Sequence, residues 1–207
     1  MPTKKELAIE LSKLRGFNNP KQELEQYTTP SEIAASIAWN AYMLGDIKEK
    51  IVMDLCAGTG ILGISALLLG ARRVIFIEID PEAVRVLREN LKTIGMSNYE
   101  VLISDARSVN MNADTILMNP PFGTRNRNID MEILMNASRI ARIIYSIHLA
   151  ATHEYVKMRV RELGLRITHI WNSKLLLKQS MPFHWKNKHY TDINIYRFEK
   201  IYKERGI

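Results

Sequence analysis

Short apolar runs alternate with segments of helical periodicity along most of the chain. Five runs predict buried strands, at residues 51–56, 74–79, 101–104, 115–119 and 143–148. Segments with one apolar helical face lie between or after them, at residues 62–69, 81–94, 131–140 and 152–163. Two more strand-like runs follow, at residues 167–177 and 192–198. This alternation predicts an α/β fold with a doubly wound, mostly parallel seven-stranded sheet, whose ligand lies beyond the carboxyl ends of the strands.

One connection in this pattern is too short for an ordinary crossover helix. Residues 105–114 are ten in number and mostly polar or small. If the strand order is 3-2-1-4-5, the third strand is also an edge, and an exposed apolar edge favours pairing with another chain. We therefore expect a protein partner at the third strand, with a short irregular loop covering that region as the alternative.

Length and composition fit one globular domain. The 207 residues are 46% hydrophobic and 25% charged. We expect a single domain over residues 1–207, with an N-terminal helical segment (1–50), a cofactor-binding core (51–150) and a C-terminal basic, substrate-binding part (151–207). The one cysteine, Cys56, excludes an internal disulfide and a multi-cysteine metal site, and no metal is expected. Without a signal-peptide core or an apolar run near 20 residues, a cytoplasmic protein with no membrane contact is expected.

The net charge of +7 is concentrated near the C-terminal end. Residues 155–190 hold eight Lys and Arg against one acid, Glu162. Such a patch is typical of a polyanion-binding surface, although a solvated lysine-rich face has the same composition. Aromatic and cationic residues alternate within it, which predicts RNA contacts at His184, Trp185, Lys186, Lys188 and His189. Trp185 is alternatively a core residue.

A glycine-rich segment follows the first strand and opens a helix. Gly58, Gly60 and Gly63 match the dinucleotide fingerprint, and Glu78 lies 20 residues beyond Gly58. The spacing alone permits either NAD or S-adenosylmethionine. Asp54, four residues before Gly58, favours the latter because an acid there suits the amino group of a methionine moiety. Glu78 is then expected to accept hydrogen bonds from the ribose hydroxyls. At the end of the third strand, Asp105 either receives the adenine amine or caps a turn.

Asn119-Pro120-Pro121-Phe122 follows the fourth strand and predicts chemistry on an amine. Two consecutive prolines fix the backbone and remove two donors, which leaves carbonyl acceptors. Acceptance of the two amine protons by the Asn119 amide oxygen and the Pro120 carbonyl would direct the nitrogen lone pair at a methyl donor. Phe122 offers an apolar face on which an extruded base can stack. A proline-terminated strand with a core phenylalanine explains any one of these residues but hardly all four.

A third segment, residues 26–32, has a structural explanation in part. Thr29 as N-cap, Pro30 at the first helical position and Glu32 three residues after the cap would form a capping box. Gln26 and Tyr27 are not explained in this way. The free amides of such a helix start are suited to a methionine carboxylate.

Three segments together resemble the methyltransferase-like protein 5 family: residues 24–27, 54–60 and 118–124, with further likeness at Asp130-Met131 and residues 145–148. The resemblance implies a Rossmann-like class I methyltransferase that uses S-adenosylmethionine to methylate the N6 amine of an adenosine in small-subunit ribosomal RNA. It also implies a small zinc-binding activator protein at the third-strand edge. With the motif residues above, the expected cofactor contacts are Gln26, Tyr27, Thr29, Asp54, Cys56, Gly58, Thr59, Gly60, Ile61, Glu78, Asp105, Ala106 and Asn119. Cys56 stands where the family usually has glycine, and Glu78 where aspartate is common, so a slightly displaced loop is expected.

Three other functions are compatible with parts of the pattern. A protein glutamine N5-methyltransferase needs the same two acceptors, because an amide nitrogen is an equally poor nucleophile. A non-catalytic RNA-binding module would have a damaged glycine loop or Asn-Pro-Pro-Phe group, and both are intact here. A nicotinamide oxidoreductase fits the glycine spacing but not the Asn-Pro-Pro-Phe group.

Overall fold

The predicted alternation of strands and helices is present throughout the core of the protein. A computed structural model describes residues 2–177 and 189–201. Its elements are α1 (Lys4–Ser12), α2 (Ser31–Met43), β1 (Ile51–Leu55), α3 (Ile61–Leu68), β2 (Arg73–Glu78), α4 (Pro81–Ile94), β3 (Tyr99–Ile103), β4 (Ala113–Met118), α5 (Ile129–Ile140), β5 (Ala141–Leu149), the short 3-10 helix η1 (Ala150–Thr152), α6 (His153–Glu162), β6 (Leu165–Leu177) and β7 (His189–Lys200). No helix among the described residues is long and apolar enough to cross a membrane.

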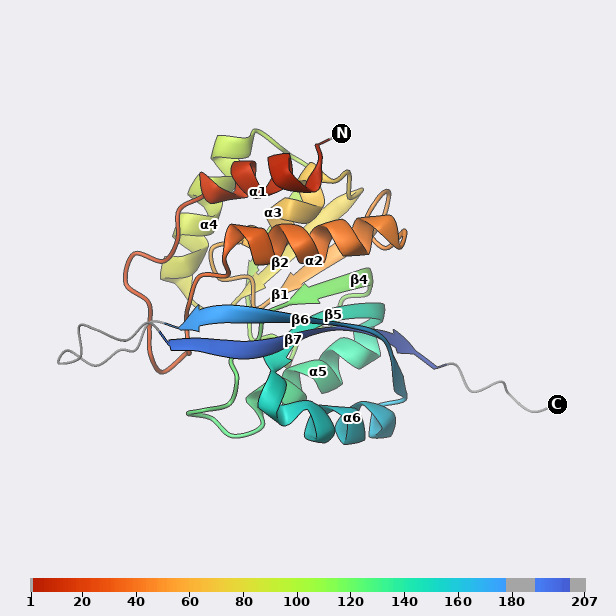
Figure 1. The fold of residues 1–207 in the computed structure, drawn as a ribbon. Helices are drawn as coiled ribbons and strands as arrows, with labels where there is room; N and C mark the ends of the chain where they lie inside the picture. The colour runs from red at the N-terminus through yellow and green to blue at the C-terminus, as the bar shows by residue number, and fades with distance from the viewer. Residues whose placement is uncertain (1, 178–188, 202–207) are drawn as a thin grey trace.

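All seven strands belong to one sheet, in the order β3-β2-β1-β4-β5-β7-β6 (Figure 1). The first five strands pair in parallel, and β7 pairs antiparallel with both β5 and β6. The predicted fold class and the order 3-2-1-4-5 are therefore confirmed. Because β5 pairs with β7 as well as β4, it is longer than the apolar run at residues 143–148 predicted.

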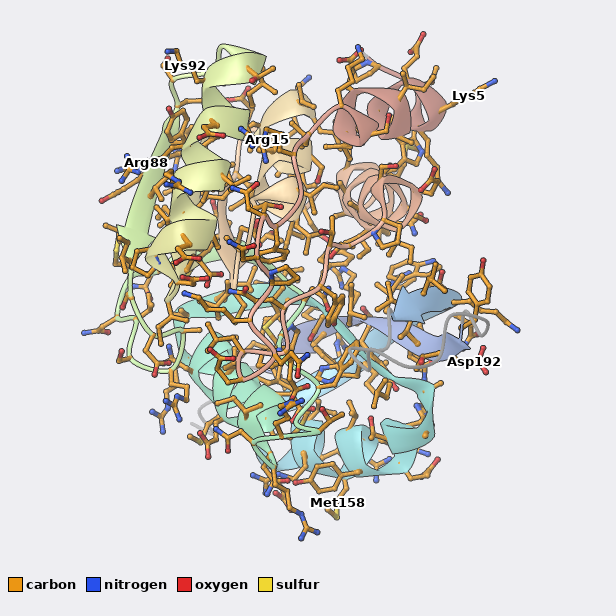
Figure 2. All side chains as sticks on the ribbon, turned by 90° about the vertical axis from the view of Figure 1, so that its left-hand side faces the viewer. Lys5, Arg15, Arg88, Lys92, Met158 and Asp192 are labelled. Atoms are coloured by element: carbon orange, nitrogen blue, oxygen red, sulfur yellow. The ribbon has the colours of Figure 1, made fainter. Side chains whose placement is uncertain are left out.

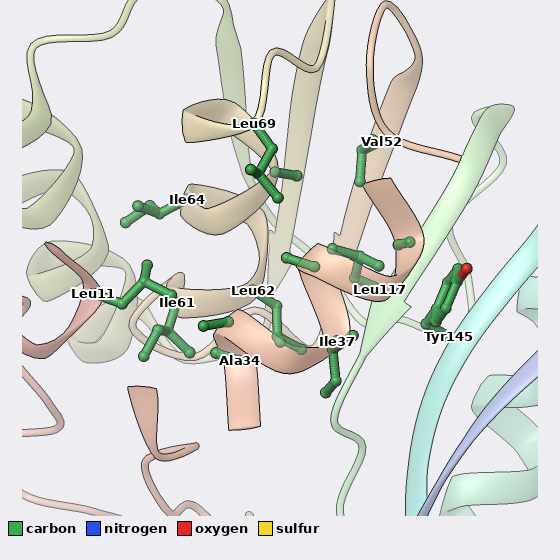
Figure 3. Close-up of a cluster of buried hydrophobic side chains, with 14 of the residues drawn as sticks. Leu11, Ala34, Ile37, Val52, Ile61, Leu62, Ile64, Leu69, Leu117 and Tyr145 are labelled. Carbon is green, nitrogen blue, oxygen red and sulfur yellow. The ribbon is translucent and has the colours of Figure 1, made fainter. Parts of the chain in front are cut away.

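Alternate residues of the central strands pack on opposite faces of the sheet, as a period of two requires. Val52 and Leu117 belong to a cluster beneath α1 to α4, which Figure 3 shows in part. Met53 and Ile116 belong to a second cluster beneath α5 and α6. Figure 1 shows the two groups of helices on opposite sides of the sheet, in three layers. The central strands are thus buried on both faces.

The second face is covered unevenly, because residues 104–112, all of them described, contain no helix. This loop packs Ala106 and Val109 into the second cluster, and the Asn136 amide of α5 donates to both of their carbonyls, at 2.8 and 3.0 Å. An irregular loop therefore covers part of the region. No strand among the described residues pairs with the outer side of β3, where Ile103 is 56% exposed. The third strand is an edge, as predicted.

A buried ion pair fastens the connection between α2 and β1 to the far half of the sheet. Asp46, 8% exposed, accepts from the Tyr145 hydroxyl of β5 at 2.7 Å and from Nε of Arg197 of β7 at 2.8 Å. Its backbone carbonyl accepts from the Thr115 hydroxyl of β4 at 2.6 Å. One residue thus joins three strands that are distant in sequence.

Replacing Asp46 by Ala is expected to destabilise the fold by about 3–5 kcal/mol, because the Arg197 guanidinium would remain buried without its counter-charge. Urea unfolding measures the change. Asp192→Ala is the matched control, since it removes one partner of a pair with Lys174 in which both side chains are 71% exposed. That loss is expected to cost under about 1 kcal/mol. Equal effects of the two substitutions would contradict a structural role for the Asp46 cluster.

Candidate active site

A pocket opens at the carboxyl ends of β1, β2 and β4. The strand order changes direction between β1 and β4, and open α/β sheets bind their ligands at such a point. The pocket holds about 1130 Å³ of empty space, including its mouth. Its walls come from the loop after β1, the end of β2, the loop after β3, the end of β4 and the segment before α2. Residues at and just before the start of α5, among them Asn126 and Ile129, also line it, so segments distant in sequence form one site.

The glycine loop after β1 has the tight shape that its sequence predicts. Gly60 precedes α3 with φ +91°, and a Cβ there would lie 2.1 Å from the Leu87 side chain of α4. Gly63 has no room for a side chain either, since a Cβ would lie 2.3 Å from the Phe76 ring of β2. Glycine at position 60 therefore lets the loop lie close to α4, and glycine at position 63 lets the first turn of α3 lie close to β2.

Cys56 adopts a backbone conformation that favours glycine. The φ angle of Cys56 is +66°, in the left-handed region, and Cys56 lines the pocket. The cysteine therefore follows the path expected of a glycine at this position, at the expense of backbone strain. The slight displacement of the loop expected from this cysteine stays a prediction.

Two buried acids lie at the base of the pocket. Asp54 accepts from the Gly63 amide at 2.7 Å, and Glu78 accepts from the amides of Gly58 and Asp80 at 2.7 and 2.9 Å. Burial raises the pKa of Asp54 to about 8 and also raises the pKa of Glu78. The negative charge of Glu78 raises the pKa of Asp54 further. Burial raises the pKa of the nearby Cys56 thiol as well, and both carboxylates add to that shift. Neither carboxylate has a cationic partner within residues 2–177 and 189–201, and such buried acids suit a ligand that brings an ammonium and hydroxyl donors. The amino acid and ribose parts of S-adenosylmethionine have these groups, so the residues fit this cofactor.

Asp105 lies at the rim of the same pocket. Its carboxylate accepts from the Arg107 amide at 2.9 Å and pairs with the Arg107 guanidinium at 2.6 Å. Hydrogen bonding to Arg107 lowers the pKa of Asp105, so this acid stays charged. The turn-capping interpretation of Asp105 is confirmed, and its contact with adenine stays a prediction. Arg107 itself was not identified from the sequence.

Residues 21–29, here called the strap, pass over one side of the pocket. Gln26 donates to Asp80, the N-cap residue of α4, at 2.8 Å, and Lys21 pairs with the same carboxylate at 2.7 Å. On the other side, the Arg125 amide donates to Glu25 at 2.9 Å. The strap is therefore fastened both to the cofactor side and to the loop that follows the Asn-Pro-Pro-Phe group.

The segment before the strap is fixed to α4 as well. The Arg15 amide donates to the Asn90 side chain at 2.9 Å, and Asn90 donates to the Thr59 carbonyl of the glycine loop at 2.9 Å. Figure 2 shows Arg15 beside α4, whose outer surface carries Arg88 and Lys92. The sequence did not predict a role in the site for Asp80 or Asn90. Asp80, directly before Pro81, is recognisable from the sequence only as a helix N-cap residue.

Asn119 stands at the end of β4 with both ends of its amide bonded. Its Oδ1 accepts from the Tyr27 hydroxyl at 2.7 Å, and its Nδ2 donates to the Thr29 hydroxyl at 2.9 Å. The Tyr27 ring stacks on Phe122 with 5.3 Å between centroids. The strap thus supports two members of the Asn-Pro-Pro-Phe group.

The predicted capping box at Thr29 is wrong. Helix α2 begins at Ser31, Pro30 is its N-cap residue, and no side chain caps it. The Thr29 hydroxyl is engaged instead by Asn119, 90 residues along the chain. A long-range partner has replaced the local one that the sequence pattern favoured.

Most of the predicted site residues meet in this pocket. Of the expected cofactor residues, all but Gly60 line it; Gly60 lies behind the loop, against α4. Among the four motif residues, Asn119 and Pro121 line it, Pro120 is buried, and Phe122 packs on Tyr27. The predicted RNA contacts at His184, Trp185, Lys186 and Lys188 lie outside the described residues, and His189 begins β7. Their roles stay predictions.

Cys56→Gly is expected to leave stability unchanged or raise it by up to about 1.5 kcal/mol. Relief of a left-handed conformation gains about 1–2 kcal/mol, against about 0.5–1 kcal/mol for the greater freedom of glycine in the unfolded chain. Urea unfolding measures the effect. Cys56→Ala is the control, since it shortens the side chain but keeps the strain. A glycine variant less stable than the alanine variant would show that the cysteine is not strained.

Comparison with known proteins agrees with the geometry of the pocket. Residues 34–162 match a family model described as "Conserved hypothetical protein 95". The rRNA N(6)-adenosine-methyltransferase Mettl5 of Drosophila melanogaster is 35% identical, over 89% of this chain and 90% of its own. A solved structure from Pyrococcus horikoshii, a candidate RNA methyltransferase, is 45% identical over 98% of this chain and 100% of its own, with a TM-score of 0.91.

A more distant structure shares the fold alone. The magnesium protoporphyrin IX methyltransferase of Synechocystis, solved with bound S-adenosylmethionine, has a TM-score of 0.65 at 13% identity, over 81% of this chain and 77% of its own. The Rossmann-like sheet, the acids that fit S-adenosylmethionine and the extent of the match with Mettl5 agree with one another. The chain therefore belongs to the methyltransferase-like protein 5 family and is an enzyme that uses S-adenosylmethionine.

Proposed function

We propose that this enzyme methylates the N6 amine of an adenosine in RNA, and that small-subunit ribosomal RNA is its substrate. The observation that carries the proposal is the place of Asn119: its bonded amide lines the same pocket as Asp54 and Glu78. An acceptor for an amine thus lies within the cofactor pocket. Relatives named as rRNA N(6)-adenosine-methyltransferases support the same substrate class.

An adenine amine needs help because its lone pair is delocalised into the ring. When bound, S-adenosylmethionine supplies a methyl group on a sulfonium. Asn119 Oδ1 has two acceptor positions, of which Tyr27 uses one, so the other is available for an amine proton. The Pro120 carbonyl is the second acceptor. Together the two would orient the nitrogen and stabilise the positive charge that it gains. No base is needed first, because the product ammonium loses its proton readily.

Recognition of the polyanion needs positive charge near the pocket mouth. Arg125 and Arg127 are exposed on the loop between the Asn-Pro-Pro-Phe group and α5, and Asn126 between them lines the pocket. These arginines supplement the predicted contacts at residues 184–189. The position of this loop supports RNA over a glutamine side chain, the nearest alternative substrate.

The uncovered edge of β3 supports a second part of the proposal, a small zinc-binding activator protein that adds a strand there. Ile103, the last residue of the edge strand β3, is 56% exposed. Pairing at this edge would satisfy the open backbone groups of β3 and cover this side chain.

The test is transfer of radiolabelled methyl from S-adenosylmethionine to purified small-subunit ribosomal RNA that lacks the modification, with and without a candidate activator protein, followed by nucleoside analysis. We expect label in N6-methyladenosine, and little in large-subunit RNA. Asn119→Ala is the control: transfer is expected to fall at least about 100-fold, the scale of a lost transition-state contact, while cofactor affinity changes little. Label on a protein glutamine, and none in RNA, would overturn the proposal. Equal activity with and without the activator would overturn its role.

Cofactor affinity is expected to rise with pH between about 6 and 7.5. Asp54 has a pKa of about 8 in the free enzyme, and a bound ammonium would lower it, so binding at pH 7 releases a proton. The gain is at most about tenfold per pH unit for one proton. Calorimetry in buffers of different ionisation enthalpy counts the protons. Asp54→Asn is expected to abolish most of the release; if it does not, Glu78 is the titrating group.

A further inference from the structure

The Tyr27 hydroxyl connects the strap to the predicted catalytic amide. It donates to Asn119 Oδ1 at 2.7 Å across 92 residues of sequence. Burial raises the pKa of the Tyr27 phenol well above its usual value, so the hydroxyl keeps its proton and remains a donor. The residue was expected to contact the cofactor, but this hydrogen bond joins it to Asn119.

The two hydroxyls on Asn119 differ in chemistry in a way that selects one orientation of the amide. A phenol is a stronger donor and a weaker acceptor than an aliphatic hydroxyl, because its oxygen lone pair is delocalised into the ring. Tyr27 therefore favours the amide oxygen, and Thr29 favours the amide nitrogen, as observed at 2.7 and 2.9 Å. The reversed amide would present N–H donors to Tyr27 and lose this match. An amide turned the wrong way would also offer a donor to the substrate amine in place of an acceptor.

The same side chain supports the aromatic member of the motif. The Tyr27 ring stacks on Phe122 with 5.3 Å between centroids and 30° between planes. The backbone next to Tyr27 is held in turn, because the Gln26 side chain donates to Asp80, which is almost fully buried. Tyr27 therefore has little freedom to move away from Asn119.

We propose that Tyr27 is a positioning residue for methyl transfer, whose hydroxyl holds the Asn119 amide with its oxygen turned toward the target amine. The idea rests on the proposed function of Asn119. It assigns Tyr27 to the orientation of the nucleophile and not to cofactor binding.

The test compares Tyr27→Phe with the wild-type enzyme in single-turnover methylation of small-subunit RNA at saturating S-adenosylmethionine and RNA. Phenylalanine keeps the ring that stacks on Phe122 and removes only the hydroxyl. The rate is expected to fall about tenfold, the scale of one lost hydrogen bond, while the cofactor Kd stays within about twofold. Tyr42→Phe on α2 is the matched control, and its rate is expected to match the wild type. Thermal unfolding checks that all variants fold.

A second pair of variants examines the other end of the amide. Thr29→Val removes the acceptor for Nδ2 and is expected to slow the reaction, whereas Thr29→Ser keeps a hydroxyl and is expected to recover most of the rate. An unchanged rate in Tyr27→Phe would overturn the proposal. So would a loss that appears as weaker cofactor binding with a normal rate at saturation, since Tyr27 would then be a cofactor contact. A wild-type enzyme that labels no RNA would instead overturn the proposed function.

Discussion

Parallel pairing of β1 with both β2 and β4 is the constraint on which the site depends. It brings three strand ends to one edge of the sheet, and Asp54, Glu78 and Asn119 are the residues near those ends. A side chain that follows a parallel strand has no freedom to lie elsewhere, because the strand direction and the register are set by burial on both faces. The distance between the two buried acids and the Asn119 amide is therefore a property of the sheet. The loops and helix caps adjust this distance, but the pairing of the strands sets it.

Burial makes the same edge electrostatically unusual. Asp54 and Glu78 are surrounded by the core and receive backbone amides, yet neither has a cationic partner among the described residues. Asp80, only two residues beyond Glu78, has such a partner in Lys21, and its pKa is lowered although burial alone would raise it. Asp54 and Glu78 are thus unpaired within the described residues, whereas Asp80 holds the strap. The three acids differ because Lys21 and Gln26 of the strap contact the Asp80 carboxylate.

Local signals in the sequence were sufficient for the strands, the glycine loop and helix α4. Pro81 after Asp80 and Gly95 after Ile94 mark the two ends of that helix, and the structure has it at Pro81–Ile94. Interactions between distant segments were not predictable in this way. Nothing near Thr29 indicates that its hydroxyl binds Asn119, and the local pattern favoured a capping box. Residues 145–148, which form part of the family resemblance, also gave no role, whereas the structure shows His148 between Asp130 and Ser146, at 3.2 and 2.8 Å, in the core.

The short connection after β3 affects both how the sheet is covered and which residues form the rim of the pocket. Omission of a crossover helix leaves one edge of the sheet thinly covered, and the loop in its place carries Asp105 and Arg107 to the pocket rim. A full helix there would cover more of the face of the sheet beside β3. The loop is held instead by the two hydrogen bonds from Asn136 of α5, a helix that begins directly after the loop bearing Arg125 and Arg127. The edge strand β3, the pocket rim and α5 are therefore joined through this one loop, so the proposed partner strand on β3 would lie next to a segment that contacts both the rim and α5.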